Sequence, residues 1–361
     1  MDKDKVKGVI LHGGRGTRLR PLTHTGPKQL IPVANKPMSQ YVLEDLRDSG
    51  IEEIAVIVGD VMPEKVRSHF GDGKRFGVRI TYLHQERPGG IAEAVKLAEN
   101  FVGDNPFVVY LGDNLLKGKI AEFVEEFKDS KNDAMILLCE VENPRQFGVA
   151  EFDKNRKLVR LVEKPKKPSS NYALTGIYFL KPVIFRMIEQ LKPSGRGELE
   201  ITEALQSLLD AGYTVGYKLV TGWWKDTGTV EDILEANRLV LEDLKKKVEG
   251  TVEEKSSMQG RVAIGKETIV RRGALLRGPA IVGKNTTIGE HVYVGPYTSI
   301  GNNVKIETGE IENSIIMDDC HVEIDGKITD SLVGAGTTLT TNRKSPKGYR
   351  LVVGEYSQIV L

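Results

Sequence analysis

The C-terminal third of the chain carries an aliphatic residue at every sixth position, and this repeat constrains the fold more than any other feature of the sequence. The residues are Ile264, Val270, Leu276, Val282, Ile288, Val294, Ile300 and Ile306. Glycine follows five of them, and a small or β-branched residue stands two places before each one. A period of six is neither helical nor that of a simple sheet, and it is the signature of a parallel β-helix. The period slips after Ile306 and resumes at Ile316, Val322 and Ile328.

The first two thirds of the chain alternate short apolar runs with helix-like segments. The expected strands cover residues 6–11, 54–58, 80–83, 107–111 and 135–138. The expected helices cover residues 37–49, 63–70 and 92–101, and each is closed by a glycine. This alternation predicts an α/β domain with a Rossmann-like, mainly parallel sheet. Ligands bind such sheets beyond the C-terminal ends of the strands.

The pattern changes near residue 244, where we expect one domain to end. A charged amphipathic helix over residues 230–244 is followed by three lysines and by a polar stretch over residues 253–259. We therefore predict a first domain over residues 1–244, a linker over 245–258 and a hexapeptide-repeat domain over 259–361. Two domains suit a chain of 361 residues. The last residues, 351–361, read as one more strand that caps the repeat.

Composition excludes several classes of function. There are 51 basic and 50 acidic residues, so no overall basic field favours a nucleic-acid partner. No stretch approaches the roughly 20 apolar residues of a membrane span. The only cysteines, Cys139 and Cys320, make no disulfide framework, which favours a reducing, cytoplasmic location. The six histidines are scattered without ligand spacing, so no histidine-based metal site is expected.

A glycine-rich loop directly after the first expected strand predicts a phosphate-binding site. It reads Gly13-Gly14-Arg15-Gly16-Thr17-Arg18. Glycines let the backbone N–H groups approach an anion closely, and Arg18 adds fixed positive charge. The loop lacks the third glycine of the dinucleotide fingerprint and the Gly-Lys-Ser/Thr of a Walker A loop. Lys28, held in a segment flanked by prolines, is a second candidate phosphate ligand.

The loop, taken together with Pro27-Lys28-Gln29-Leu30-Ile31-Pro32, resembles the signature of the sugar-1-phosphate nucleotidyltransferases. The resemblance runs from the first strand to the C-terminus and is closest to the long glucose-1-phosphate thymidylyltransferases, which have a hexapeptide tail. It implies a Rossmann-like nucleotidyltransferase domain followed by a left-handed parallel β-helix. It also implies transfer of a nucleotidyl group from dTTP or UTP to glucose 1-phosphate, with release of pyrophosphate.

Two aspartates are candidate metal ligands. Asp113 and Asp226 each follow an apolar, strand-like segment, so both could reach one edge of the sheet. From spacing alone, a turn or helix-capping aspartate is the simpler interpretation. The resemblance implies instead that they hold the catalytic Mg²⁺, which prefers oxygen ligands together with substrate phosphates.

The resemblance also assigns the remaining site residues. On the nucleotide side these are Leu11, Gly13, Gly14, Gly16, Thr17, Arg18, Gln29, Gln85 and Gly90. On the sugar-phosphate side they are Asn114, Gly148, Glu163, Lys164 and Leu174. The catalytic set is Arg18, Lys28, Asp113, Lys164 and Asp226. These groups position substrates and neutralise charge, and none has to act as a nucleophile.

Further residues lie near the expected base or in another stretch shared with the family. The resemblance places Gln85 and Gly90 at the base of the nucleotide, and the carboxamide of Gln85 can pair with a donor and an acceptor on a pyrimidine. His12 stands where the family has a small residue, usually alanine, beside the base. Glu200 and Thr202 lie in a stretch shared with the family, and their simplest role is helix capping.

Two alternative functions stay open. Hexapeptide helices often carry acyltransferases, so the chain could be an N-acetylglucosamine-1-phosphate uridylyltransferase with an acetyltransferase tail. The tail histidines, His291 and His321, are nevertheless expected to face solvent. The other alternative is a non-catalytic regulatory relative, although all five catalytic candidates are present. We expect the tail to support a homo-oligomer, because an exposed solenoid edge needs covering.

Overall fold

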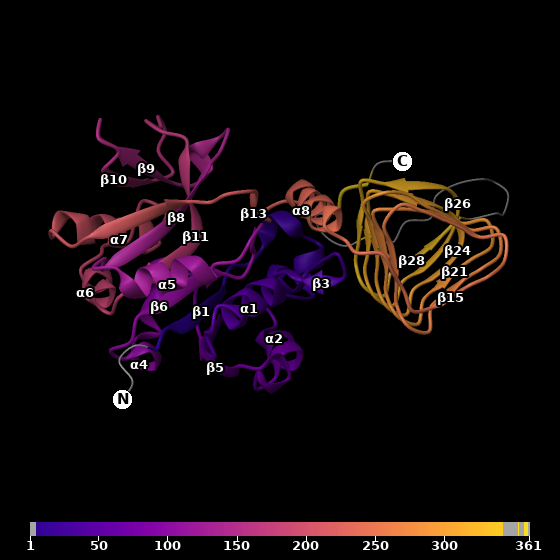
Figure 1. The fold of residues 1–361 in the computed structure, drawn as a ribbon, viewed down its shortest axis with the longest axis horizontal. Helices are drawn as coiled ribbons and strands as arrows, with labels where there is room; N and C mark the ends of the chain where they lie inside the picture. Colours follow the sequence, from indigo (N-terminus) through magenta and orange to yellow (C-terminus); the bar gives the residue numbers. More distant parts are fainter. Residues whose placement is uncertain (1–4, 342–352, 354–356, 360–361) are drawn as a thin grey trace. The chain divides into compact units, whose positions relative to one another are not determined.

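The computed structural model describes residues 5–341, 353 and 357–359, and these form two compact units (Figure 1). The first unit contains the residues up to Gly16, Thr23–Leu30 and Met38–Asp226. The second contains Thr17–Leu22, Ile31–Pro37 and the chain from Thr227 onward. The strand expected over residues 351–361 falls mostly outside the described residues. No helix among the described residues is long and apolar enough to cross a membrane.

A nine-stranded sheet forms the centre of the first unit, in the order β10-β9-β11-β6-β1-β4-β5, with β8 beside β11 and β12 beside β8. The strands are β1 (Lys7–His12), β4 (Glu53–Val58), β5 (Arg79–His84), β6 (Phe107–Leu111), β8 (Ala134–Glu140), β9 (Gly148–Phe152), β10 (Leu158–Glu163), β11 (Tyr172–Leu180) and β12 (Val215–Leu219). Strands β6, β1, β4 and β5 are parallel, as the alternating pattern predicts. The expected strand at 135–138 lies in β8, which pairs antiparallel with β11.

Helices cover both faces of this sheet, because side chains alternate along each strand. In β1, Val9 and Leu11 pack with one group of helices, and Ile10 packs with the other. The first group is α3 (Ile91–Lys96), α6 (Val183–Glu189) and α7 (Ile201–Asp210), and the second is α1 (Met38–Asp48), α2 (Pro63–Phe70) and α5 (Ala121–Asp129). The helix expected over 92–101 is two helices, α3 and α4 (Glu99–Val102).

Shorter elements complete the first unit. Strand β7 (Asn114–Leu116) pairs antiparallel with β13 (Trp224–Asp226). The 3₁₀ helices of this unit are η2 (Leu22–His24), which begins at the unit boundary, η3 (Lys28–Leu30), η4 (Lys74–Phe76) and η5 (Pro144–Gln146). The second unit takes η1 (Thr17–Leu19) and the antiparallel pair β2 (Pro32–Val33) and β3 (Lys36–Pro37).

The second unit is built mainly from short parallel strands stacked in register, as expected for a parallel β-helix (Figure 1). The strands are β14 (Lys247–Val248), β15 (Thr251–Val252), β16 (Ser257–Gln259), β17 (Val262–Ile264), β18 (Ile269–Val270), β19 (Leu275–Arg277), β20 (Ala280–Val282), β21 (Thr287–Ile288), β22 (Tyr293–Val294), β23 (Thr298–Ile300), β24 (Lys305–Glu312), β25 (Ile315–Ile316), β26 (His321–Thr329), β27 (Leu332–Val333) and β28 (Thr338–Thr340). Val262 pairs with Ala280 and Ala280 with Thr298, so one coil comprises three hexapeptides. All eight aliphatic residues of the repeat are buried in one core.

Where the hexapeptide period slips, the coil changes. Strand β24 is long and carries irregularities in its pairing with β26, and Ile311 enters the core although the period does not predict it. The buried threonines of the repeat also form hydrogen bonds between coils. Thr286 Oγ1 accepts from the Val304 N–H at 3.1 Å and donates to the Gly301 carbonyl at 2.9 Å.

The stretch predicted as a linker, residues 245–258, contains β14, β15 and most of β16, which pair with β17, β18 and β19. It follows α8 (Val230–Glu242), which begins with a capping box between Thr229 and Asp232. The buried Asn237 of α8 joins parts of the second unit. Its side chain accepts from the Ala34 N–H at 2.8 Å and donates to the Tyr297 carbonyl at 2.9 Å.

Candidate active site

The glycine-rich loop and Asp113 are neighbours because β1 and β6 are adjacent and parallel. Leu11 pairs with Leu111, so both strands end at the same edge of the sheet. Beyond this pair the Gly112 N–H donates to the Leu11 carbonyl at 3.0 Å. A Cβ at Gly112 would lie 2.9 Å from that oxygen, so the close approach requires glycine. The strands thus bring the glycine-rich loop and a carboxylate to one place.

Side chains of the following segment hold the shape of the loop. Gln29 Nε2 donates to the Gly13 carbonyl at 3.0 Å, and Thr23 Oγ1 donates to the Gly16 carbonyl at 2.8 Å. Gly14 and Gly16 have positive φ angles of 97° and 59°, which favour glycine. With two carbonyls engaged and the backbone bent in this way, the loop is preorganised before any anion binds.

Lys28 forms an ion pair with Asp113, and both side chains are largely buried. Burial raises the pKa of the Asp113 carboxyl, but the adjacent Lys28 ammonium outweighs this effect and holds that pKa below its usual value. Asp113 is therefore ionised at neutral pH. Two predicted catalytic residues thus meet beside the loop, and the carboxylate is in the state that a metal ligand requires.

Asn114 connects Asp113 to the strand that carries Asp226. Its Nδ2 donates to Asp113 Oδ1 at 3.1 Å, and its Oδ1 accepts from Trp224 Nε1 at 2.8 Å. Asp226 is the register partner of Asn114 in the β7–β13 pair. The structure therefore brings the two predicted metal ligands into one neighbourhood. It also shows that the Asn114 side chain orients Asp113.

The predicted base-reading residues also gather near the loop. Gln85 is buried, and its Nε2 donates to Glu93 Oε2 at 2.9 Å and, more weakly, to the Gly90 carbonyl at 3.4 Å. Its Oε1 lies 3.0 Å from the position of a Cβ on Gly13. Gly90 has a φ of 102°, and a Cβ there would lie 2.4 Å from the Leu199 carbonyl oxygen. Glu93 thus orients the amide so that its acceptor oxygen faces the loop.

On the predicted sugar-phosphate side, Glu163 is held by several groups. Its Oε1 lies 3.1 Å from Arg196 Nη2 and 3.6 Å from Lys164 Nζ. Its Oε2 accepts from the buried Thr202 hydroxyl at 2.8 Å. Gly148 is its register partner, and a Cβ there would lie 2.6 Å from Thr202 Oγ1. The carboxylate is therefore fixed, and glycine at 148 leaves the space that this arrangement needs.

Lys164 and Leu174 also lie on this side of the first unit. Lys164 follows β10 directly and adopts a left-handed backbone with a φ of 40°, which is uncommon for a residue other than glycine. Its N–H donates to the Phe147 carbonyl at 3.0 Å, and its side chain is partly exposed. Leu174 is buried in β11, just before that strand's irregularity.

Thr17 and Arg18 belong to the second unit, unlike the other predicted site residues. Arg18 lies against Gly228, where a Cβ would be 2.7 Å from Nη2. The assignment of Thr17 and Arg18 to the nucleotide site stays a prediction.

Sequence reasoning missed Arg196 and assigned Glu200 and Thr202 wrongly. Glu200 directly precedes α7 at the N-cap position, but no side chain caps this helix. Glu200 Oε1 instead accepts from Arg196 Nη2 and from the Ser194 hydroxyl, both at 2.8 Å. Arg196 therefore bridges Glu163 and Glu200. The only sequence signal was the family resemblance of this stretch, because such contacts between distant segments leave no local pattern.

His12 lies inside the protein, at the end of β1. It is 3% exposed, and its ring meets the Phe70 ring edge-on at a centroid distance of 5.9 Å. Neither ring nitrogen has a hydrogen-bond partner in the described part of the chain. Burial lowers the pKa of His12 to about 3. The residue is therefore a neutral, packed side chain on the face of the sheet opposite to Leu11.

The fold and this site define a class of protein: an α/β protein whose candidate ligand site lies at the end of a parallel sheet. Comparison with known proteins gives the family. The family model described as "Nucleotidyl transferase" matches residues 7–243, and the model described as "GMPPB C-terminal domain" matches residues 276–358. The chain belongs to the nucleotidyl transferase family.

Curated relatives match almost the whole chain. The low-salt glycan biosynthesis nucleotidyltransferase Agl11 of Haloferax volcanii is 49% identical over 99% of this chain and 100% of its own length. A glucose-1-phosphate thymidylyltransferase of Streptomyces antibioticus is 44% identical over 98% of this chain and 99% of its own. A solved Bacillus anthracis protein, described as a candidate glucose-1-phosphate thymidylyltransferase in complex with sucrose, is 43% identical, with a TM-score of 0.63. The match covers 67% of this chain and 97% of that one.

The environment of His12 makes a prediction about pH. Its pKa in the folded protein lies below the ordinary value of about 6.5, so below that pH the unfolded chain binds the extra proton. His12 should therefore lower the free energy of unfolding progressively as the pH falls from 6.5 toward 3. In ¹⁵N NMR spectra its ring should stay neutral at pH 5, with the signal assigned through a His12→Phe variant. A protonation midpoint near 6.5 in the folded protein would contradict the prediction.

Proposed function

We propose that this chain transfers the thymidylyl group of dTTP, or the uridylyl group of UTP, to glucose 1-phosphate and releases pyrophosphate. The buried Lys28–Asp113 pair beside the glycine loop, with Asp226 on the neighbouring strand pair, carries this proposal. An anion-binding loop, two carboxylates and a lysine at one sheet edge are the parts that such a transfer needs. The Streptomyces relative, a glucose-1-phosphate thymidylyltransferase, supports the choice of substrates.

Asp113 and Asp226 are the proposed ligands of Mg²⁺. The nucleotidyl transferase family generally requires a divalent metal ion. The residues fit one, because Asp113 is ionised and Asn114 orients it. Oxygen ligands from two carboxylates, completed by substrate phosphates and water, suit Mg²⁺. Bound there, Mg²⁺ would supply charge neutralisation at the α-phosphate.

The proposed reaction needs no protein nucleophile. The ionised phosphate of the sugar attacks the α-phosphorus, the bond to the β-phosphate oxygen breaks, and pyrophosphate leaves. We assign Arg18 and the N–H groups of the loop to the triphosphate, with Lys28 assisting. On the resemblance to the family we assign Lys164 to the sugar phosphate and Glu163 to a sugar hydroxyl, and the two lie side by side at the end of β10. Positioning and charge neutralisation account for the rate.

The orientation of Gln85 supports a thymine or uracil base. Glu93 accepts a hydrogen bond from the side-chain amide N–H of Gln85, so Gln85 Oε1 is the atom turned toward the loop. An acceptor there suits the N3–H of thymine or uracil, whereas cytosine presents an acceptor at N3. The amide does not contact the thymine methyl, and we therefore keep both dTTP and UTP as candidate substrates.

For the tail we propose a left-handed parallel β-helix that supports a homo-oligomer. Its first strand, β14, is an edge strand with Val248 41% exposed, and such edges are usually covered. We place the catalytic domain at residues 1–244, in line with the family match to 7–243, and the tail at 259–361. Residues 245–258 connect the two, and their strands pair with the tail. A cytoplasmic location is supported by two free cysteines.

Self-association can be measured by sedimentation. The full chain should sediment as a multiple of its 39.9 kDa mass, and a chain ending at residue 244 should sediment as a smaller assembly. Equal numbers of protomers in the two assemblies would exclude the tail as the oligomerisation element.

The function is tested by measuring pyrophosphate release from dTTP, UTP, CTP, ATP and GTP with several sugar 1-phosphates. We expect the highest kcat/KM with dTTP or UTP and glucose 1-phosphate. Asp226→Asn removes the negative charge of a proposed metal ligand and should lower kcat at least about 100-fold. The exposed Asp104→Asn serves as a control that should keep full activity. If no pyrimidine triphosphate gives pyrophosphate release, the proposed reaction is refuted. Near-normal turnover in Asp226→Asn would refute the assignment of Asp226 as a metal ligand.

Thr202 should act as a positioning residue for Glu163. Thr202→Val removes the hydroxyl that donates to Glu163 Oε2, a hydrogen bond to a charged group that is worth about 1.5–3 kcal/mol. We expect KM for the sugar phosphate to rise about tenfold or more while KM for the nucleotide stays unchanged. Thr202→Ser keeps the hydroxyl and should restore the KM. Equal increases in both KM values, or no rescue by serine, would indicate a purely structural role.

A further inference from the structure

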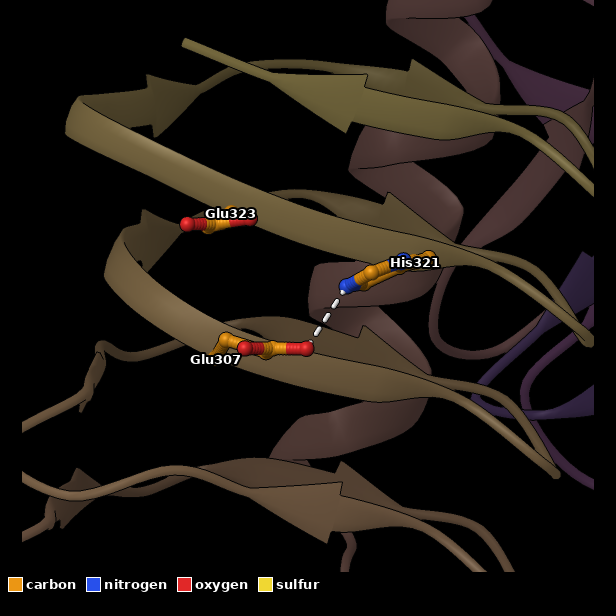
Figure 2. Close-up of side chains that lie close together, drawn as sticks. All are labelled: Glu307, His321 and Glu323. Atoms are coloured by element: carbon orange, nitrogen blue, oxygen red, sulfur yellow. Dashed lines mark hydrogen bonds and ion pairs between the residues drawn. The ribbon is translucent and has the colours of Figure 1, made fainter. Parts of the chain in front are cut away.

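Three side chains that can ligate a metal come together on the surface of the second unit, away from the proposed active-site residues in the sequence. They are Glu307 on β24 and His321 and Glu323 on β26 (Figure 2). One ligand atom from each lies within 4.8 Å of the others. His321 Nε2 is 3.0 Å from Glu307 Oε1. The spacing of histidines in the sequence did not predict this group, because two successive coils contribute to it.

The parallel pairing of β24 with β26 explains why these residues meet. Ile306 pairs with Val322, and both are buried in the core of the second unit. Because side chains alternate along a strand, their neighbours Glu307, His321 and Glu323 point outward. Figure 2 shows the three side chains on adjacent strands. The buried pair therefore anchors the backbone from which all three ligands extend.

We propose that Glu307, His321 and Glu323 bind a zinc ion. One imidazole and two carboxylates form a mixed nitrogen and oxygen donor set, which suits Zn²⁺, whereas Mg²⁺ and Ca²⁺ prefer oxygen ligands alone. Zinc bonds of about 2.0–2.2 Å bring tetrahedral ligand atoms to about 3.4 Å from one another. The His321–Glu307 separation is already close to that value. The third ligand reaches it by rotation of partly exposed glutamate side chains, and water completes the coordination.

Lys305 competes for this site. Its ammonium lies 2.6 Å from Glu307 Oε1, the same oxygen that His321 approaches. An ion pair between partly exposed side chains contributes little to stability, so a divalent cation can displace the lysine. The lysine therefore gives the test a variant that should change affinity in the opposite direction to a ligand variant. Removing its charge should tighten zinc binding, whereas removing a ligand should weaken it at least about tenfold.

Zinc bound here would connect two successive coils of the tail. Its effect on stability follows from mass action, because the ligands are assembled only in the folded chain. This role is separate from the proposed transfer reaction and does not depend on it.

The test is a titration of the full chain with Zn²⁺ in excess Mg²⁺, which occupies carboxylate sites elsewhere. Wild type should bind one zinc ion per chain at this site. His321→Ala and Glu323→Gln should bind that ion at least about tenfold more weakly. His291→Ala, the other tail histidine, is the matched control and should bind as wild type does. Lys305→Met should bind zinc more tightly. With Co²⁺ as a probe, wild type should show a visible absorption band that His321→Ala lacks.

The proposal is overturned if Glu323→Gln and His321→Ala bind as many zinc ions as wild type with the same Kd. Equal weakening in His291→Ala would also overturn it. Circular dichroism of the metal-free variants separates loss of a ligand from loss of the fold, and Glu323→Gln decides the matter should His321→Ala fold poorly.

Discussion

The pairing of β1 with β6 is the constraint on which the rest of the site depends. Because Leu11 and Leu111 are partners in a parallel pair, both strands end together, and the glycine loop emerges next to Asp113. The close contact of Gly112 with the Leu11 carbonyl leaves no room for a side chain at this junction. A shift of one residue in the register would turn Leu11 out of its core and move the loop away from the carboxylate. The hydrophobic alternation that stabilises the sheet therefore also sets the geometry of the site.

Acidic side chains in this site are paired with basic ones. Lys28 neutralises the buried Asp113, and Arg196 with Lys164 neutralises Glu163. A buried carboxylate without such a counter-ion would be costly. Lys28 and Lys164 are also the lysines that bind phosphates under the proposed function. The same lysines can therefore stabilise the folded site before substrates arrive and the phosphates afterwards, with little reorganisation of the backbone.

The sequence predicted those features that follow from local pattern. The hexapeptide period placed eight core residues correctly, because a narrow core demands an aliphatic side chain at each face. The expected strand over 107–111 coincides with β6 and the helix over 63–70 with α2, because each has a glycine or polar turn at its end. The contacts of Thr202 and Arg196 with Glu163 could not be read in this way, since they join segments more than 30 residues apart. The strands in residues 245–258 were also missed. Val252 and Met258 do stand at the six-residue spacing and pack against the core of the tail, but the charged and polar residues around them read as a linker.

The irregular coil of the tail brings together three side chains in a way that the regular coils do not. In the regular coils the pairing joins residues 18 apart, as in the ladder of Asn285 and Asn303, and the outward positions carry no group of three metal-ligating side chains among the described residues. Between Asn303 and Asp319 the separation falls to 16. The irregular pairing of β24 with β26 then begins directly after Ile306. A strict hexapeptide repeat would keep Glu307 in the turn that follows each strand. Here the residue instead continues the extended strand, and its carboxylate lies beside His321 on the next coil.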